Sequence, residues 1–274
     1  MSAAAAESTP GPVSVPYYDD EDDMDSWSDK RMGLSGLSDY DRMIGQAERE
    51  LGVKIGKPGR ARTYKLVVYG LVRPLALFYG LWHPVRVEGL EHLPKRGAYV
   101  MLSNHQYLID PFLVVSKYSK RPVHAVNKLQ NFKKWYAFII RAMGQIPFIR
   151  KGTTAQKDVA MNIAGQILQD GGIVALYPEG SRAPGIIAKW HAMVIFELRK
   201  RFPAVTVVSI SMRYTKGFRG PTIIKIGQPV VHNNPATIQD AREITNFHRS
   251  QIVAMSPSLR DEPQFDTLKG HIQD

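Results

Sequence analysis

Between residues 84 and 255, short apolar runs alternate with segments whose apolar residues recur at helical spacing. The short runs indicate buried strands, and the longer segments between them indicate helices. This alternation predicts an α/β fold in which a mixed central sheet is flanked by helices. The predicted strands are 85–88, 98–103, 123–126, 145–149, 173–177, 205–214 and 222–226, and the predicted helices are 111–119, 131–143, 153–169, 189–201 and 234–255.

The rest of the chain divides by composition. Residues 1–36 consist mainly of Ala, Ser, Pro, Gly and acidic residues, and they hold too few apolar side chains to form a core. We therefore expect a disordered acidic tail there, followed by a helical, membrane-associating segment over 37–82. The α/β domain is expected over 83–255, and a loose C-terminal tail over 256–274.

Residues 62–82 form the most apolar run of the chain. The apolar core of this run, 66–82, is seventeen residues long, which is near the lower limit for crossing a bilayer, and Arg73 and Pro74 lie at its middle, where a charge is costly. Its aromatic residues suit a membrane interface. Three interpretations follow: a buried core helix, a helix that dips into one leaflet, and a membrane span.

Charge is distributed unevenly along the chain. Eight of the 25 Asp and Glu lie in residues 1–29, which contain no Lys or Arg, so all 36 basic residues lie beyond them. Such a basic body attracts polyanions: nucleic acid, an anionic membrane or phosphorylated substrates. The absence of cysteine excludes disulfides, thiolate nucleophiles and cysteine-ligated zinc. The N-terminus lacks the basic region and apolar core of a secretory signal, so a cytoplasmic location is expected.

The predicted strand 98–103 runs directly into Asn104 and His105, and Asp110 follows five residues after the histidine. A histidine beside a carboxylate can act as a general base, because the carboxylate orients the ring and stabilises the imidazolium. Asp110 also suits the N-cap of a helix that starts at Pro111, a role that needs no contact with His105. From the pair alone, both interpretations of Asp110 stay open.

A second polar segment, Pro-Glu-Gly-Ser-Arg at 178–182, follows the predicted strand 173–177. Gly180 lets a substrate approach the backbone, and Arg182 can bind a phosphate through two parallel hydrogen bonds. The alternative is a turn with a surface salt bridge. Ser181 lacks the Gly-x-Ser-x-Gly context of a nucleophile elbow, so we do not expect an acyl-serine intermediate.

Together the two segments resemble the glycerolipid acyltransferase family typified by bacterial 1-acylglycerol-3-phosphate acyltransferase. That family carries Asn-His-x-x-x-x-Asp, matched by Asn104, His105 and Asp110, and Pro-Glu-Gly-Thr/Ser-Arg, matched by residues 178–182. Two weaker blocks match at Lys128 with 144–150, and at 202–208. The chain departs from the family pattern at His191, where a glycine is usual.

The resemblance implies a glycerol-3-phosphate acyltransferase-like sandwich. It also implies that the protein transfers an acyl group from a thioester to the free hydroxyl of a lysophospholipid. The thioester implied is acyl-CoA, which acts as a co-substrate. The acceptor implied is 1-acylglycerol-3-phosphate, and the product is phosphatidate. His105 is then the general base and Asp110 its orienter. The substrate-binding residues implied are Lys128, Arg150 and Arg182 at the acceptor phosphate, Glu179 at its glycerol part, and Gly180 and Ser181 in the same segment. No cofactor and no metal are expected, because the other histidines have no ligand-like grouping.

Basic and aromatic residues interleave over 128–141, which suits a surface lying on anionic lipid. We therefore expect an anionic membrane surface as a partner, at the cytoplasmic face of the cell membrane, in a peripheral or monotopic arrangement. Nucleic acid is not expected, because no nucleic-acid-binding module is recognisable. Two alternatives stay open: an acyltransferase that acts on a sugar hydroxyl of a glycolipid, and a non-catalytic membrane adaptor.

Overall fold

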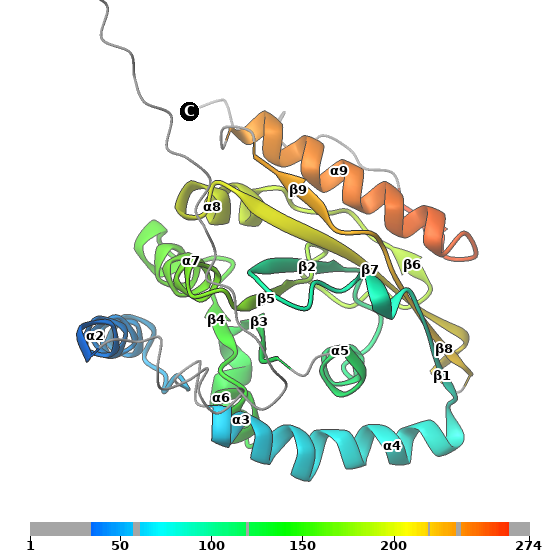
Figure 1. Ribbon diagram of the computed structural model, residues 1–274, viewed down its shortest axis with the longest axis horizontal. Helices are drawn as coiled ribbons and strands as arrows, with labels where there is room; N and C mark the ends of the chain where they lie inside the picture. The colour runs from blue at the N-terminus through cyan, green and yellow to red at the C-terminus, as the bar shows by residue number, and fades with distance from the viewer. Residues whose placement is uncertain (1–33, 57–60, 119–120, 219, 234–236, 263–274) are drawn as a thin grey trace, which may run out of the picture.

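The computed structural model describes residues 34–56, 61–118, 121–218, 220–233 and 237–262. Its centre is an eight-stranded sheet with the strand order β1–β8–β7–β2–β5–β3–β4, and β9 pairs with β7 (Figure 1). β2 runs parallel to β5 and β7, whereas β8 and β9 run antiparallel to β7, so the predicted mixed sheet is confirmed. The strands are β1 (Val85–Glu88), β2 (Tyr99–Ser103), β3 (Val123–Lys128), β4 (Ile146–Phe148), β5 (Ile173–Leu176), β7 (Val205–Phe218), β8 (Thr222–Ile226) and β9 (Val230–His232).

Helices cover both faces of this sheet (Figure 1). The α-helices are α2 (Leu34–Leu51), α3 (Ala61–Val67), α4 (Arg73–Trp82), α5 (Asp110–Tyr118), α6 (Ala137–Ala142), α7 (Thr154–Gln169), α8 (Met193–Arg201) and α9 (Ile238–Met255). Side chains of β2 alternate between two cores: Val100 and Leu102 pack with α7, α8 and α9, and Tyr99 and Met101 pack with α4 and α5. Every residue of β2 is buried, which explains why its sequence is an unbroken apolar run.

The apolar run 62–82 is one continuous helical segment, in which α3, a π-helical turn (Val68–Val72) and α4 follow one another. Its contact with the protein is a narrow seam of five buried side chains, Tyr64, Val68, Val72, Ala76 and Tyr79. The face opposite this seam is exposed and apolar, with Leu66, Leu75, Leu77, Phe78, Leu81 and Trp82 all more than half exposed. Residues Tyr64–Trp82 are long and apolar enough to cross a membrane, and 22% of that window is buried. The interpretation as a buried core helix is therefore wrong.

Several elements differ from the sequence-based expectations. The helix expected over 131–143 is split into a 3₁₀ turn (Leu129–Lys133) and α6, and α8 begins at Met193 instead of residue 189. Residues 256–262, the first part of the tail expected to be loose, instead return to the protein, and 263–274 lie outside the described residues. Ser256 and Leu259 are buried, and β10 (Arg260–Asp261) pairs with β6 (Ile186–Ile187). Of the predicted acidic tail, 1–33 lies outside the described residues, while 34–36 begin α2.

Two buried histidines are expected to make stability depend on acidity. His124 bonds to Gly144 O, and His248 bonds to Ser209 Oγ and to His232 Nε2. Burial lowers the pKa of His124 to about 4 and that of His248 to about 3, from an ordinary value of 6.5. Below about pH 6.5 these two histidines are therefore protonated in the unfolded chain but not in the folded protein. Their contribution to the free energy of unfolding falls as the pH falls.

We expect the free energy of unfolding to drop by about 2 kcal/mol per histidine between about pH 7.5 and about pH 5. Urea unfolding at the two pH values measures this difference. Glu179 acts in the opposite direction over this range: burial raises its pKa to about 8, so the folded protein binds that proton at a higher pH than the unfolded chain does. Comparison with the His124→Asn variant, which keeps a donor toward Gly144 O and cannot titrate, isolates the contribution of His124. Between about pH 7.5 and about pH 5, the change in the free energy of unfolding should be about 2 kcal/mol less unfavourable for this variant than for the unaltered protein. An equal change in the two proteins would contradict this expectation.

Candidate active site

The side chain of Asn104 extends the pairing of β2 at the point where the loop that carries His105 leaves the sheet. The Asn104 side chain donates from Nδ2 to Met212 O (2.9 Å) and accepts at Oδ1 from Met212 N (2.8 Å). It thus continues the pairing of β2 with β7 by one position after the β2 backbone has turned away. Asn104 is fully buried, and both polar ends of its amide are satisfied. This anchor fixes the point at which His105 enters the site.

Asp110 closes the loop back onto itself. Its Oδ2 lies 2.9 Å from His105 Nδ1 and accepts hydrogen bonds from the backbone N–H groups of Gln106 (2.6 Å) and Tyr107 (2.9 Å). These partners precede α5, and Asp110 is itself the first residue of that helix. The interpretation as a helix N-cap is therefore wrong, because a cap accepts from amides inside the helix.

A buried tyrosine contacts the other oxygen of Asp110. Tyr214, near the middle of β7, donates its hydroxyl hydrogen to Oδ1. Burial raises the pKa of Tyr214 far above its ordinary value, and the charge of Asp110 raises it further, so the phenol stays protonated as a donor. The sequence analysis missed Tyr214, which lies more than one hundred positions from Asp110. Its position at the end of the apolar strand predicted over 205–214 is the signal that marks it, since a buried tyrosine hydroxyl needs a partner.

The His105 ring is held on one edge and open on the other. Nδ1 faces Asp110, and the ring lies tilted by 34° against Tyr177 with 4.5 Å between the ring centres. The side chain is 18% exposed, whereas that of Asp110 is fully buried. With Nδ1 donating to a carboxylate, Nε2 is the nitrogen left to accept a proton from a substrate.

Glu179 ties the two polar segments together. Its Oε2 accepts from the backbone N–H of His105 (3.0 Å), and its Oε1 accepts from that of Ala188 (3.1 Å). Burial raises the pKa of Glu179 to about 8, although these two N–H groups act in the opposite direction. The Glu179 carboxyl group therefore links the loop that follows β2 to the segment that follows β5.

Gly180 and Arg150 fit against each other. Gly180 has a left-handed backbone (φ 61°), and a Cβ placed on it would lie 2.8 Å from Arg150 Cζ and closer still to Nη2. A glycine is needed for two reasons: any other residue would be strained in this backbone conformation, and its side chain would displace the guanidinium of Arg150. The absence of a side chain at position 180 thus sets where Arg150 lies.

Three cations gather around this contact. The pKa of Lys128 is lowered by burial and then by the charges of Arg150 and Arg182, which places the three charges near one another. Arg150 also lowers the pKa of His191, after burial. Within the described part of the chain, no carboxylate forms an ion pair with any of the three cations. Like charges without a counterion form a site that attracts an anion such as phosphate.

The predicted site residues thus form two adjoining groups. His105, Asp110 and Glu179 are joined by hydrogen bonds, and Lys128, Arg150, Gly180 and Arg182 gather beside them. Ser181 lies exposed in the turn between Gly180 and Arg182. Among the described residues, no group of three His, Asp or Glu side chains is arranged to hold a metal ion.

Residues 84–214 match the family model described as Acyltransferase, in agreement with the family resemblance seen in the sequence. Among solved structures, the chain is similar to the 1-acyl-sn-glycerophosphate (LPA) acyltransferase PlsC from Thermotoga maritima. The two share 21% identity with a TM-score of 0.52, over 77% of this chain and 88% of that one. This likeness confirms the fold. No curated protein matches the chain in sequence.

Proposed function

We propose that this protein transfers a fatty acyl group from acyl-CoA to the free hydroxyl of a lysophospholipid, with 1-acylglycerol-3-phosphate as acceptor and phosphatidate as product. The observation that carries the proposal is the position of the His105–Asp110 pair beside three cations that form no ion pair with a carboxylate of the described residues. A base and an anion site side by side suit an acceptor that carries both a hydroxyl and a phosphate.

In this proposal, His105 Nε2 takes the proton of the acceptor hydroxyl as its oxygen attacks the thioester carbonyl carbon. Asp110 holds the ring and stabilises the imidazolium. The tetrahedral intermediate collapses, the carbon–sulfur bond breaks, and the imidazolium returns its proton to the CoA thiolate. Lys128, Arg150 and Arg182 bind the acceptor phosphate. Both oxygens of Glu179 accept from backbone N–H groups, so Glu179 holds the His105 backbone, and its contact with the glycerol part of the acceptor stays a prediction.

An acceptor panel tests this assignment. Purified protein is supplied with acyl-CoA and, side by side, lysophosphatidate, a neutral monoacylglycerol and a glycolipid with a free sugar hydroxyl. The proposal requires that lysophosphatidate is acylated with the highest kcat/KM. Acylation of the sugar lipid alone would overturn it in favour of a glycolipid acyltransferase, and no ester with any acceptor would favour the adaptor alternative.

We propose that the exposed face of α3 and α4 binds the cytoplasmic surface of an anionic membrane. α3 contacts α6, which carries Phe138 (53% exposed), and Trp135, two residues before α6, is 85% exposed. Lys133 and Lys134 are exposed in the same short stretch. Apolar and aromatic side chains flanked by lysines match the interface of a bilayer with negatively charged headgroups. The acceptor would then reach the site from the membrane on which the protein lies.

Replacing two side chains of this face should weaken membrane binding. In the Phe78→Ser/Leu81→Ser variant, we expect binding to phosphatidylglycerol-containing vesicles to fall at least about 10-fold, because each large apolar side chain buried in lipid contributes about 1.5–3 kcal/mol. The matched control is Val231→Ser/Phe247→Ser, which alters two exposed apolar residues of β9 and α9, on the opposite side of the sheet from α4 (Figure 1). Vesicle sedimentation measures both variants, and an equal loss in the two would contradict the proposal.

A further inference from the structure

The chain beyond α9 returns to the segment that follows Arg182. β10 runs parallel to β6, with Arg260 paired to Ile186 and Asp261 paired to Ile187. The backbone N–H of Arg260 donates to Gly185 O (3.1 Å), and that of Glu262 donates to Ile187 O (3.0 Å). In the described part of the chain, β10 is the strand that β6 pairs with, and this two-stranded sheet is separate from the central one. Two residues on each side make a ladder too short to be stable without further support.

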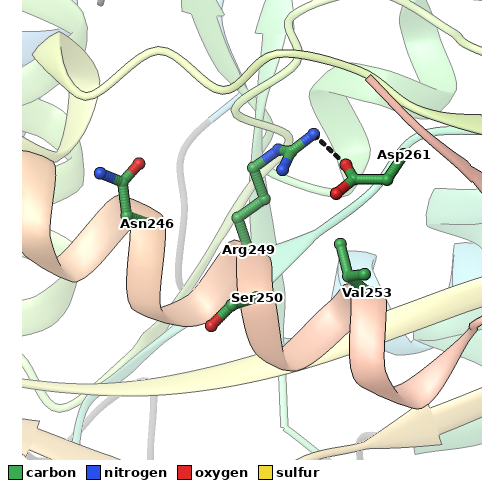
Figure 2. Close-up of a pocket in the computed structure, with 5 residues that line it drawn as sticks. All are labelled: Asn246, Arg249, Ser250, Val253 and Asp261. Carbon is green, nitrogen blue, oxygen red and sulfur yellow. Dashed lines mark hydrogen bonds and ion pairs between the residues drawn. The ribbon is translucent and has the colours of Figure 1, made fainter. Parts of the chain in front are cut away.

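That support comes from Arg249 of α9. Its guanidinium donates to Ile187 O (3.1 Å) and Ala188 O (3.2 Å) on one side, and to the Asp261 carboxylate and Glu262 O on the other. Figure 2 shows Arg249 reaching from α9 toward Asp261, at a small pocket lined by both residues. Arg249 is 6% exposed, and a buried cation is tolerated because it is paired in this way. Arg249 therefore fastens the ladder to α9.

The same segment that β10 holds is bonded to the His105 loop at three points. Ala183 N donates to His105 O (2.7 Å). The Gln106 side chain accepts from Gly185 N (2.6 Å) and donates to Ile186 O (2.8 Å). Ala188 N donates to Glu179, whose other oxygen accepts from His105 N. Residues 183–188 are thus the layer between β10 and the backbone of His105.

We infer that residues 259–262 form a strap that positions the catalytic loop, and that Arg249 is a positioning residue that acts through it. Apart from β6, the segment 180–188 is irregular, and Gly180 and Gly185 have left-handed backbones, so little in the segment itself fixes its course. The strap supplies that restraint from a distant part of the sequence. The consequence for catalysis rests on the proposed function, whereas the restraint on the loop does not.

The experiment removes the two strap hydrogen bonds while leaving buried residues untouched. The Arg260→Pro/Glu262→Pro variant lacks both donor N–H groups, and the matched Arg260→Ala/Glu262→Ala variant loses the same side chains but keeps the donors. Amide hydrogen exchange is measured over 104–107 and 183–188, with β5 and α7 as internal references. Steady-state kinetics are measured with acyl-CoA and lysophosphatidate varied in turn.

We expect the proline variant to exchange faster at 104–107 and 183–188 than the alanine variant, with β5 and α7 unchanged. We also expect kcat to fall about 10-fold or more and the KM for lysophosphatidate to rise, while the KM for acyl-CoA stays unchanged. Identical exchange in the two variants would overturn the strap, as would acceleration spread evenly over β5 and α7. If exchange responds as expected but even the unaltered protein forms no ester, the strap stands and the proposed function fails.

Discussion

Replacing His105 with alanine is expected to lower kcat/KM about 10²–10⁴-fold, the usual effect of removing a general base. The reason is positional: Nδ1 is held by Asp110, and Nε2 is the nitrogen left to take the hydroxyl proton. Steady-state acylation of lysophosphatidate measures the loss. The KM values should change little, because the imidazole acts on the reacting proton and not on the phosphate or the acyl chain.

The Asp110→Asn variant separates ring orientation from charge. An asparagine can still accept at the position of Oδ2 and can turn its NH₂ toward the Tyr214 hydroxyl, which is able to accept a hydrogen bond. The loop should therefore keep its shape, while the negative charge beside the imidazolium is lost. We expect kcat to fall substantially, with circular dichroism and melting temperature showing a folded protein. Full activity of either variant would remove the replaced residue from the mechanism.

Replacing Arg150 with alanine is expected to raise the KM for lysophosphatidate about 10–100-fold, because a hydrogen bond to a charged group contributes about 1.5–3 kcal/mol. Arg150 lies against Gly180 and beside Lys128, at the centre of the cation cluster. Kinetics with a phosphate-bearing acceptor and with a neutral monoacylglycerol, measured on the same variant, reveal which part of the acceptor Arg150 contacts.

The neighbouring residue provides the control. Lys151 is exposed and carries the same charge, so Lys151→Ala removes one positive charge from the protein without altering the cluster. We expect this variant to behave like the unaltered protein. A rise in KM of equal size for both acceptors, or in both variants, would show that Arg150 does not bind the phosphate.

Local sequence patterns predicted the strands well, because β2 and β5 are buried throughout and form unbroken apolar runs, whereas β1 and β8 alternate in burial as their side chains alternate along the sequence. β1 and β8 have the predicted bounds. The predicted helix 131–143 failed for a geometric reason. Its buried residues include Phe132 and Ala137, and a five-residue step would rotate the second about 140° away from the first on one helix. The chain instead breaks between them.

The site was predicted only as far as its motifs are local. His105 and Asp110 stand five positions apart, so their pairing is visible in the sequence, but the alternative role of Asp110 as a cap is equally local. The partners that decide between these roles include Tyr214, which pairing of β2 with β7 brings beside Asp110. The contacts of Arg249 and β10 could not be predicted for the same reason: the fold brings them together, and no pattern in the sequence relates residues 260–262 to 183–188.

One measurement tests the central claim most directly: the identity of the product formed from isotopically labelled acyl-CoA and 1-acylglycerol-3-phosphate, determined by mass spectrometry for the unaltered protein and for His105→Ala. The account predicts phosphatidate that carries the label as a new ester at the formerly free hydroxyl, formed by the unaltered protein and nearly absent with the variant. Labelled phosphatidate formed equally fast by both proteins, or none formed by the unaltered protein, would contradict it.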